Sequence, residues 1–232
     1  MKEFIPPEFL TFGRNANNMN FIPEEIDRYA VTHSSEEPEL LQRLGRETFQ
    51  KVLQPRMLSG HYQGRILSMI SKLVRPSSVL EIGTYTGYSA LCFAEGLAPG
   101  GKIHTIDVNE ELYDIQKKYF DLSPYKGQII QYLGDATEII PELDLNFDLI
   151  FIDADKPNYP RYLELVIKKL NPGGIILSDN VLWSGKVVQE VQKDDESTLA
   201  LLEYNEQLAR HPQLETVLLP IRDGLTISRK RD

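Results

Sequence analysis

Beyond residue 77, short apolar runs alternate with segments whose apolar residues recur at helical spacing. A short continuous apolar run is typical of a strand buried on both faces of a parallel sheet. Such runs predict strands over residues 79–82, 103–106, 129–133, 147–153, 174–179, 216–219 and 225–228. Helices are expected between them, over about 91–97 and 159–170, after Asn109 and around 199–208. The alternation predicts an α/β fold with a doubly wound, mostly parallel sheet and right-handed crossovers, closed by a hairpin through 222–224.

Residues 1–75 lack this alternation and have the pattern of helices. Pro23 followed by two glutamates predicts a helix start. Apolar residues then recur at helical spacing over 40–53 and over 66–73, and the second stripe stops before Pro76. Because neither stripe indicates an independent core, we expect residues 1–75 to be a helical cover over the active edge of an α/β domain formed by residues 76–232.

Composition narrows the class of protein. The chain has 232 residues, 41% of them hydrophobic, enough for the core of one large α/β domain. A net charge of −9 and a pI near 5.1 count against general affinity for nucleic acid or anionic membrane. The single cysteine, Cys92, excludes an internal disulfide, fits a reducing compartment and lies in an apolar run expected in the core. Since no signal-peptide pattern and no membrane-spanning apolar stretch occurs, we expect a cytoplasmic protein without a membrane partner.

Two predicted strands end at acidic residues. The run 149–152 leads into Asp153, Ala154, Asp155 and Lys156, and the run 175–178 leads into Asp179 and Asn180. In a parallel sheet the carboxyl ends of both strands open on one crevice, where α/β sheets bind ligands. Carboxylate and amide oxygens suit a hard divalent cation such as Mg²⁺ or Ca²⁺ better than zinc, and Lys156 is placed to handle a proton. Alone, Asp179 could equally be a helix cap, and Lys156 would more often be a solvated lysine, but their joint occurrence favours a site.

A glycine turn follows the first predicted strand, in the segment Glu81-Ile82-Gly83-Thr84-Tyr85-Thr86-Gly87. A dinucleotide site requires a glycine where this chain has Tyr85, because the backbone must approach a pyrophosphate there. No P-loop lysine follows either. The pattern instead favours a nucleoside ligand without phosphates, with Asp107 as the ribose acceptor about 20 residues further on. S-adenosylmethionine is such a ligand.

Together, three segments resemble the cation-dependent O-methyltransferases, the family of catechol and caffeoyl-CoA O-methyltransferases and their bacterial relatives. The segments are Glu81–Ser89, Ile152–Lys156 and Ser178–Trp183, and the resemblance runs from about Met57 to Arg229. It implies a seven-stranded class I methyltransferase sheet of Rossmann-like form, with residues 76–232 as the catalytic domain, and a homodimer.

The resemblance also implies roles for individual residues. The cofactor-binding set is Ser59, Glu81, Gly83, Thr84, Tyr85, Ser89, Asp107, Asp135, Ala136 and Asp153. The cation ligands would be Asp153, Asp179 and Asn180, with Lys156 and Asp153 as catalytic residues. Met57, Lys156 and Trp183 would line the acceptor pocket. Two positions differ from the mammalian catechol enzyme: Thr226 stands where that enzyme has a glutamate, and Asp155 matches the caffeoyl-CoA branch instead.

The resulting hypothesis is S-adenosylmethionine- and cation-dependent methylation of a vicinal dihydroxy aromatic small molecule. An alternative acceptor is a hydroxylated uridine in tRNA, against which the acidic net charge counts. A non-catalytic adenosylmethionine-binding relative is a third possibility, which the presence of Asp153, Lys156, Asp179 and Asn180 disfavours. His61 lies near the expected cofactor entry and is a weak candidate for a catalytic role.

Overall fold

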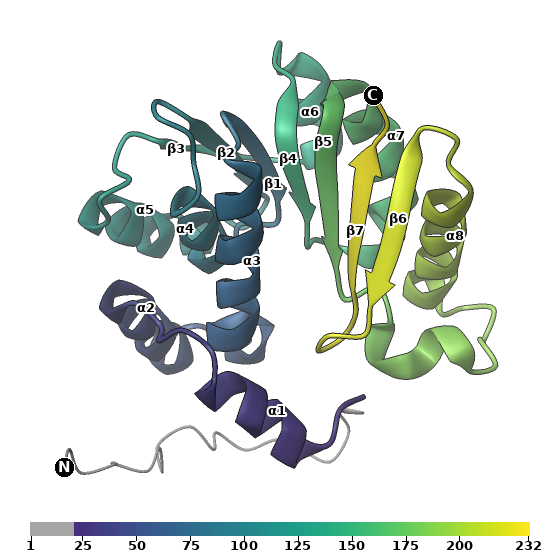
Figure 1. Cartoon of the computed structure of the whole chain (residues 1–232), viewed down its shortest axis with the longest axis horizontal. Helices are drawn as coiled ribbons and strands as arrows, with labels where there is room; N and C mark the ends of the chain where they lie inside the picture. The colour runs from purple at the N-terminus through teal and green to yellow at the C-terminus, as the bar shows by residue number, and fades with distance from the viewer. Residues whose placement is uncertain (1–20) are drawn as a thin grey trace.

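The computed structural model describes residues 21–232, in which a seven-stranded sheet is covered by helices on both faces (Figure 1). The strands are β1 (Ser78–Ile82), β2 (Lys102–Asp107), β3 (Ile129–Leu133), β4 (Phe147–Ile152), β5 (Leu170–Asp179), β6 (Leu214–Leu219) and β7 (Leu225–Lys230). Their order in the sheet is β3-β2-β1-β4-β5-β7-β6. The predicted doubly wound fold and all seven predicted strands are confirmed.

The sheet is parallel except at one edge. Strands β1 to β5 pair in parallel, whereas β7 pairs antiparallel with both β5 and β6. The last two strands therefore form the predicted hairpin, and β7 lies inside the sheet between β5 and β6. This arrangement places the turn of the hairpin at the same edge as the carboxyl end of β5 (Figure 1).

Alternate residues of the central strands serve two different cores. In β4, Leu149 and Phe151 pack with helices from the first half of the chain, and Ile150 and Ile152 pack with helices from the second half. The first layer contains α2 (Glu39–Lys51), α3 (Gly60–Val74), α4 (Tyr88–Ala94) and α5 (Tyr113–Leu122). The second contains α6 (Ala136–Glu142), α7 (Tyr159–Lys169) and α8 (Glu196–Arg210). Burial on both faces explains why these strands are continuous apolar runs.

Several short elements complete the chain. They are α1 (Glu24–Thr32), η1 (Pro55–Met57), η2 (Glu110–Leu112), η3 (Lys156–Asn158) and η4 (Trp183–Val188). The predicted cap is confirmed, since the Asn109 side chain accepts a hydrogen bond from the backbone N–H of Glu111. Cys92 is buried in the core, as expected. Among residues 21–232, no helix has the length and apolar character that crossing a bilayer requires.

The N-terminal helices differ in how they pack. Helix α1 buries none of its residues, and α2 and α3 contribute Leu41, Leu44 and Leu67 to the first core. The helical stripe predicted to continue to residue 53 was wrong at its end, because α2 stops at Lys51 and Leu53 is 92% exposed. The first 20 residues of the predicted cover lie outside the described residues, and its status as a dependent unit stays a prediction.

Candidate active site

Asp153 and Asp179 stand at the ends of two neighbouring parallel strands. Ile152 of β4 pairs with Ser178 of β5, so the next residue along each strand is one of the two aspartates. Asp179 is 3% exposed. Burial and, next to it, the negative charge of Asp153 together raise the pKa of its carboxyl to about 6. Asn180 follows directly in the left-handed backbone region, with φ of 59°.

Lys156 is buried beside these acids, on the short helix η3 that follows β4. Its Nζ donates to Asp153 Oδ1 over 3.2 Å and to the Tyr159 hydroxyl oxygen over 2.6 Å. That hydroxyl lies 2.9 Å from the backbone oxygen of Asp179, to which it donates. The Trp183 ring lies beyond, its centroid 5.9 Å from the lysine nitrogen. The lysine nitrogen is therefore held between both strand ends and faces an aromatic side chain.

The glycine turn lies against the end of β4. A Cβ atom at Gly83 would lie 2.0 Å from the backbone oxygen of Asp153, and Gly83 has φ of 97°. The next turn residue, Tyr85, also has positive φ, and its backbone N–H donates to Asp107 Oδ2 over 2.7 Å. The other carboxylate oxygen of Asp107 accepts from the Asn109 backbone N–H over 2.8 Å. The turn and the acid after β2 thus form one hydrogen-bonded unit next to Asp153.

Glu81 provides a buried carboxylate beneath this turn. Its Oε2 accepts from Thr105 Oγ1 over 2.5 Å, and Thr105 also bonds Thr84 Oγ1 over 2.5 Å. Burial raises the pKa of Glu81 to about 8, and the nearby Ser89 and Thr105 hydroxyls oppose the shift. Glu81 Oε1 is buried without a hydrogen-bond partner among the described residues. A buried acceptor of this kind is costly unless a ligand donor satisfies it, so it fits the ammonium group of the methionine part of S-adenosylmethionine.

The other predicted cofactor and pocket residues lie around the same edge. Ser89 and Ala136 are buried, in the first turns of α4 and α6. Asp135 is the N-cap of α6, because its Oδ1 accepts from the Thr137 backbone N–H over 2.7 Å. Ser59 precedes α3, and Met57 of η1 is 60% exposed. The cap accounts for Asp135 structurally, and its contact with adenine stays a prediction.

Three residues at this edge were missed by sequence reasoning. Gln63 of α3 donates from Nε2 to Asp179 Oδ2 over 2.6 Å. Arg222, in the β6–β7 turn, donates to Gln63 Oε1 and to the backbone oxygen of Ser59. Asp223 Oδ1 accepts from the Ser184 backbone N–H over 2.5 Å, and burial raises the pKa of this carboxyl. The sequence indicated only a turn over 222–224 and did not indicate which residues the side chains of this turn would contact.

Two residues of undecided role have structural partners. Asp155 accepts hydrogen bonds from the Tyr162 hydroxyl over 2.5 Å and from Asn158 Nδ2 over 2.6 Å. His61 Nε2 lies 2.7 Å from the backbone oxygen of Ser35, to which it can donate. These contacts attach Asp155 to α7 and His61 to the segment before α2.

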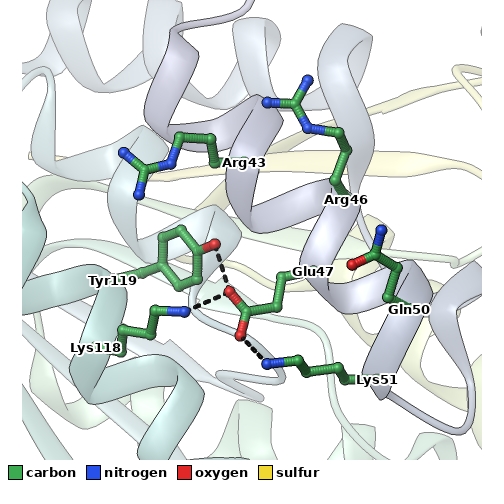
Figure 2. Close-up of a pocket in the computed structure, with 7 residues that line it drawn as sticks. All are labelled: Arg43, Arg46, Glu47, Gln50, Lys51, Lys118 and Tyr119. Atoms are coloured by element: carbon green, nitrogen blue, oxygen red, sulfur yellow. Dashed lines mark hydrogen bonds and ion pairs between the residues drawn. The ribbon is translucent and has the colours of Figure 1, made fainter.

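A surface pocket of about 310 Å³ lies elsewhere, between α2 and α5 (Figure 2). It is lined by Arg43, Arg46, Glu47, Gln50, Lys51, Lys118 and Tyr119. Figure 2 shows Glu47 at its centre, bonded to Lys51, Lys118 and Tyr119, and these bonds lower the pKa of Glu47 to about 2. None of the lining residues belongs to the predicted site, so the pocket is not where the chemistry is expected.

The donor set at the strand ends contains no histidine or cysteine. Within residues 21–232, no group of three or more His, Cys, Asp or Glu side chains gathers in a way that could hold a metal. The predicted ligands are instead two carboxylates and one amide, Asp153, Asp179 and Asn180. Such all-oxygen donors fit Mg²⁺ or Ca²⁺, which keep water or substrate oxygens as further ligands.

Comparison with known proteins identifies the fold and the chemistry together. Residues 31–231 match the family model described as O-methyltransferase. The chain belongs to this O-methyltransferase family. It is 35% identical over 205 residues to caffeoyl-CoA O-methyltransferase 1 of Arabidopsis thaliana, covering 84% of this chain and 79% of the relative.

Solved structures agree with this assignment. The O-methyltransferase of Bacillus cereus in complex with SAH has a TM-score of 0.82 at 26% identity, covering 89% of this chain and 97% of that one. The O-methyltransferase TomG of Streptomyces achromogenes in complex with SAM has a TM-score of 0.81 at 25% identity, covering 90% and 96%. The protein is an S-adenosylmethionine-dependent O-methyltransferase of the caffeoyl-CoA O-methyltransferase family.

Proposed function

We propose that this O-methyltransferase methylates one hydroxyl of a vicinal dihydroxy aromatic small molecule, with a divalent cation held by Asp153, Asp179 and Asn180. The observation that carries the proposal is the position of Asp153 and Asp179 at the ends of adjacent strands, with the buried side-chain nitrogen of Lys156 hydrogen-bonded to Asp153. The relative from Arabidopsis is named for a caffeoyl-CoA substrate, and a caffeoyl group has two neighbouring hydroxyls.

The acceptor hydroxyl must lose a proton before it can attack the methyl group. A divalent cation, when bound, lowers the pKa of a coordinated hydroxyl and orients it. Lys156, in its neutral amine form, accepts the proton and becomes an ammonium, and its bonds to Asp153 and Tyr159 fix the nitrogen at that position. Holding both reactants at one edge of the sheet makes a bimolecular step effectively intramolecular, which supplies much of the rate enhancement.

The cofactor would lie across the turn between β1 and α4. Glu81 Oε1 is the unpartnered acceptor for the methionine ammonium, and Asp107 retains lone pairs for the ribose hydroxyls. Gly83 allows the turn to approach Asp153, which would place the methyl donor next to the proposed cation site. Thr84, Tyr85, Ser89, Ser59, Asp135 and Ala136 complete the proposed cofactor site.

The acceptor pocket is proposed to lie between Trp183, Lys156 and Met57. The Trp183 ring faces the lysine nitrogen at 5.9 Å, where an aromatic acceptor could stack while its hydroxyls reach the cation.

Homodimerisation is a further proposal, which sedimentation or light scattering of the purified protein would test.

One experiment separates the candidate acceptors. The protein is incubated with methyl-labelled S-adenosylmethionine and a panel of catechols and caffeoyl esters, with EDTA in one arm and tRNA that carries a hydroxylated uridine in another. We expect methylation of vicinal diphenols that EDTA abolishes and Mg²⁺ restores. Turnover insensitive to EDTA would remove the cation from the mechanism, and methylation of tRNA without diphenols would change the acceptor class.

A further inference from the structure

A chain of side chains links the β6–β7 turn to Asp179. Arg222 donates to Gln63 Oε1, and Gln63 Nε2 donates to Asp179 Oδ2 over 2.6 Å. The three residues come from the hairpin turn, from α3 and from the end of β5. Gln63 and Asp179 are each 3% exposed, so water cannot replace the hydrogen bond between their side chains unless the surrounding structure reorganises.

Arg222 determines which way the Gln63 amide points. A glutamine amide has one oxygen and one nitrogen of nearly equal size, and their assignment follows from the hydrogen-bond partners. A guanidinium group can only donate, so the glutamine oxygen must face Arg222. The amide nitrogen then necessarily faces Asp179, where it can only donate to the carboxylate.

The same guanidinium also reaches the start of α3. Its Nη1 donates to the backbone oxygen of Ser59, the residue directly before the helix. One side chain from the hairpin turn thus holds both the first turn of α3 and the glutamine on that helix. The turn itself is strained at this point, because Arg222 has φ of 51°.

We propose that Gln63 is a positioning residue for the cation site and that Arg222 acts through it. The amide occupies Asp179 Oδ2 and leaves Oδ1 as the oxygen that would bind the cation, while Arg222 prevents the amide from turning. This inference rests on the proposed function, since it assigns the carboxylate that Gln63 orients to a cation. Removing hydrogen bonds that orient metal ligands typically lowers metal affinity by about 10- to 100-fold.

The test measures Mn²⁺ binding by electron paramagnetic resonance, which needs no turnover. The variants are Gln63→Met, Arg222→Asn, Arg222→Lys and the Gln63→Met/Arg222→Asn double variant. Asparagine suits the left-handed backbone at 222 but is too short to reach Gln63. The matched control is Arg75→Asn, because Arg75 is also exposed with φ of 51° but lies at the opposite end of α3.

We expect Gln63→Met and Arg222→Asn each to weaken Mn²⁺ binding by about tenfold or more, and the double variant to be no worse than Gln63→Met alone. Arg222→Lys should restore part of the affinity, and Arg75→Asn should bind as the wild type does. Arg222 lies on an exposed turn, so its variants carry the test if Gln63→Met does not fold.

Two results would overturn the inference. One is unchanged Mn²⁺ affinity in Arg222→Asn, and the other is an effect of Arg222→Asn that simply adds to that of Gln63→Met. A different result would show that the proposed function itself is wrong. In that case Asp179→Asn would bind Mn²⁺ as tightly as the wild type does. That result would remove the cation site itself.

Discussion

Lys156 Nζ lies 3.2 Å from Asp153 Oδ1, in a pair whose lysine side chain is 7% exposed and whose aspartate side chain is 23% exposed. The lysine is largely withdrawn from water, whereas the carboxylate keeps an open side. A buried lysine nitrogen requires hydrogen-bond partners, and Asp153 and the Tyr159 hydroxyl provide them. The exposed side of Asp153 is where the proposed cation and acceptor hydroxyl would enter.

Replacing Lys156 tests the proposed base. Lys156→Met keeps the length of the side chain but cannot accept a proton, so kcat should fall by about 100-fold or more. Steady-state kinetics with a diphenol acceptor measure the effect, and Lys168→Met on the exposed face of α7 is the matched control. Full activity in Lys156→Met would show that the proton goes elsewhere.

Tyr159 should matter through the lysine. Tyr159→Phe removes the hydroxyl that lies 2.6 Å from Lys156 Nζ and 2.9 Å from the Asp179 backbone oxygen. A hydrogen bond to a charged group contributes about 1.5–3 kcal/mol, so we expect a loss of roughly tenfold or more in kcat. Tyr204→Phe is the control, because Tyr204 is equally buried and its hydroxyl bonds Ser178 instead. Equal losses in both variants would indicate a general packing effect.

Gly83 is expected to be irreplaceable for two separable reasons. Gly100 is the control, because it has φ of 79° but no atom within 4 Å of the position that a Cβ atom would take. Gly100→Ala should therefore lower the free energy of unfolding only through the strain of a left-handed alanine, about 1 kcal/mol. Gly83→Ala introduces the same backbone strain and also places Cβ 2.0 Å from the backbone oxygen of Asp153. Its cost should therefore be roughly 3 kcal/mol or more in denaturant unfolding. Similar costs for both variants would contradict the close approach of the turn to β4.

The buried Glu81 predicts a pH dependence of stability. Its pKa is raised from 4.5 unfolded to about 8 folded, so between these values the folded state binds more protons than the unfolded state. The contribution of protonated Glu81 to the free energy of unfolding is therefore complete below about pH 4.5 and is lost as the pH rises towards 8. Between these two pH values the free energy of unfolding should fall by up to about 1.4 kcal/mol per pH unit.

Glu81→Gln should remove this slope. The comparison is best made in the cofactor-free protein between pH 6.5 and 8, above the Asp179 pKa of about 6. Unfolding free energies of wild type and variant should converge or cross as the pH rises. Parallel pH profiles would mean that Glu81 is not the titrating group.

Much of the architecture followed from the sequence because its signal is local. Apolar runs that stop at acids located the ends of β4 and β5, and the strand order then placed Asp153 beside Asp179. Helix α6 was not predicted, because it is seven residues long and contains Pro141. Helix α4 begins at Tyr88, directly after Gly87 with φ of 88°, three residues earlier than its apolar spacing predicted.

The contacts missed in the site are those between distant segments. Gln63 and Asp179 are 116 positions apart, and Arg222 is 159 positions from Gln63. On α3 the apolar stripe was visible, but nothing local indicates that a polar residue of the same helix reaches the end of β5. Such pairings arise only when the helix layer packs on the sheet.

The proposed mechanism depends above all on Asp153, Asp179 and Asn180 binding one cation that faces the methyl donor. The most direct measurement is a crystal structure with Mn²⁺ and S-adenosylhomocysteine, in which anomalous scattering locates the ion. We predict a single strong peak coordinated by the two carboxylates and the amide, beside the sulfur of the ligand. A peak elsewhere, or these three side chains directed away from a common ion, would contradict the mechanism.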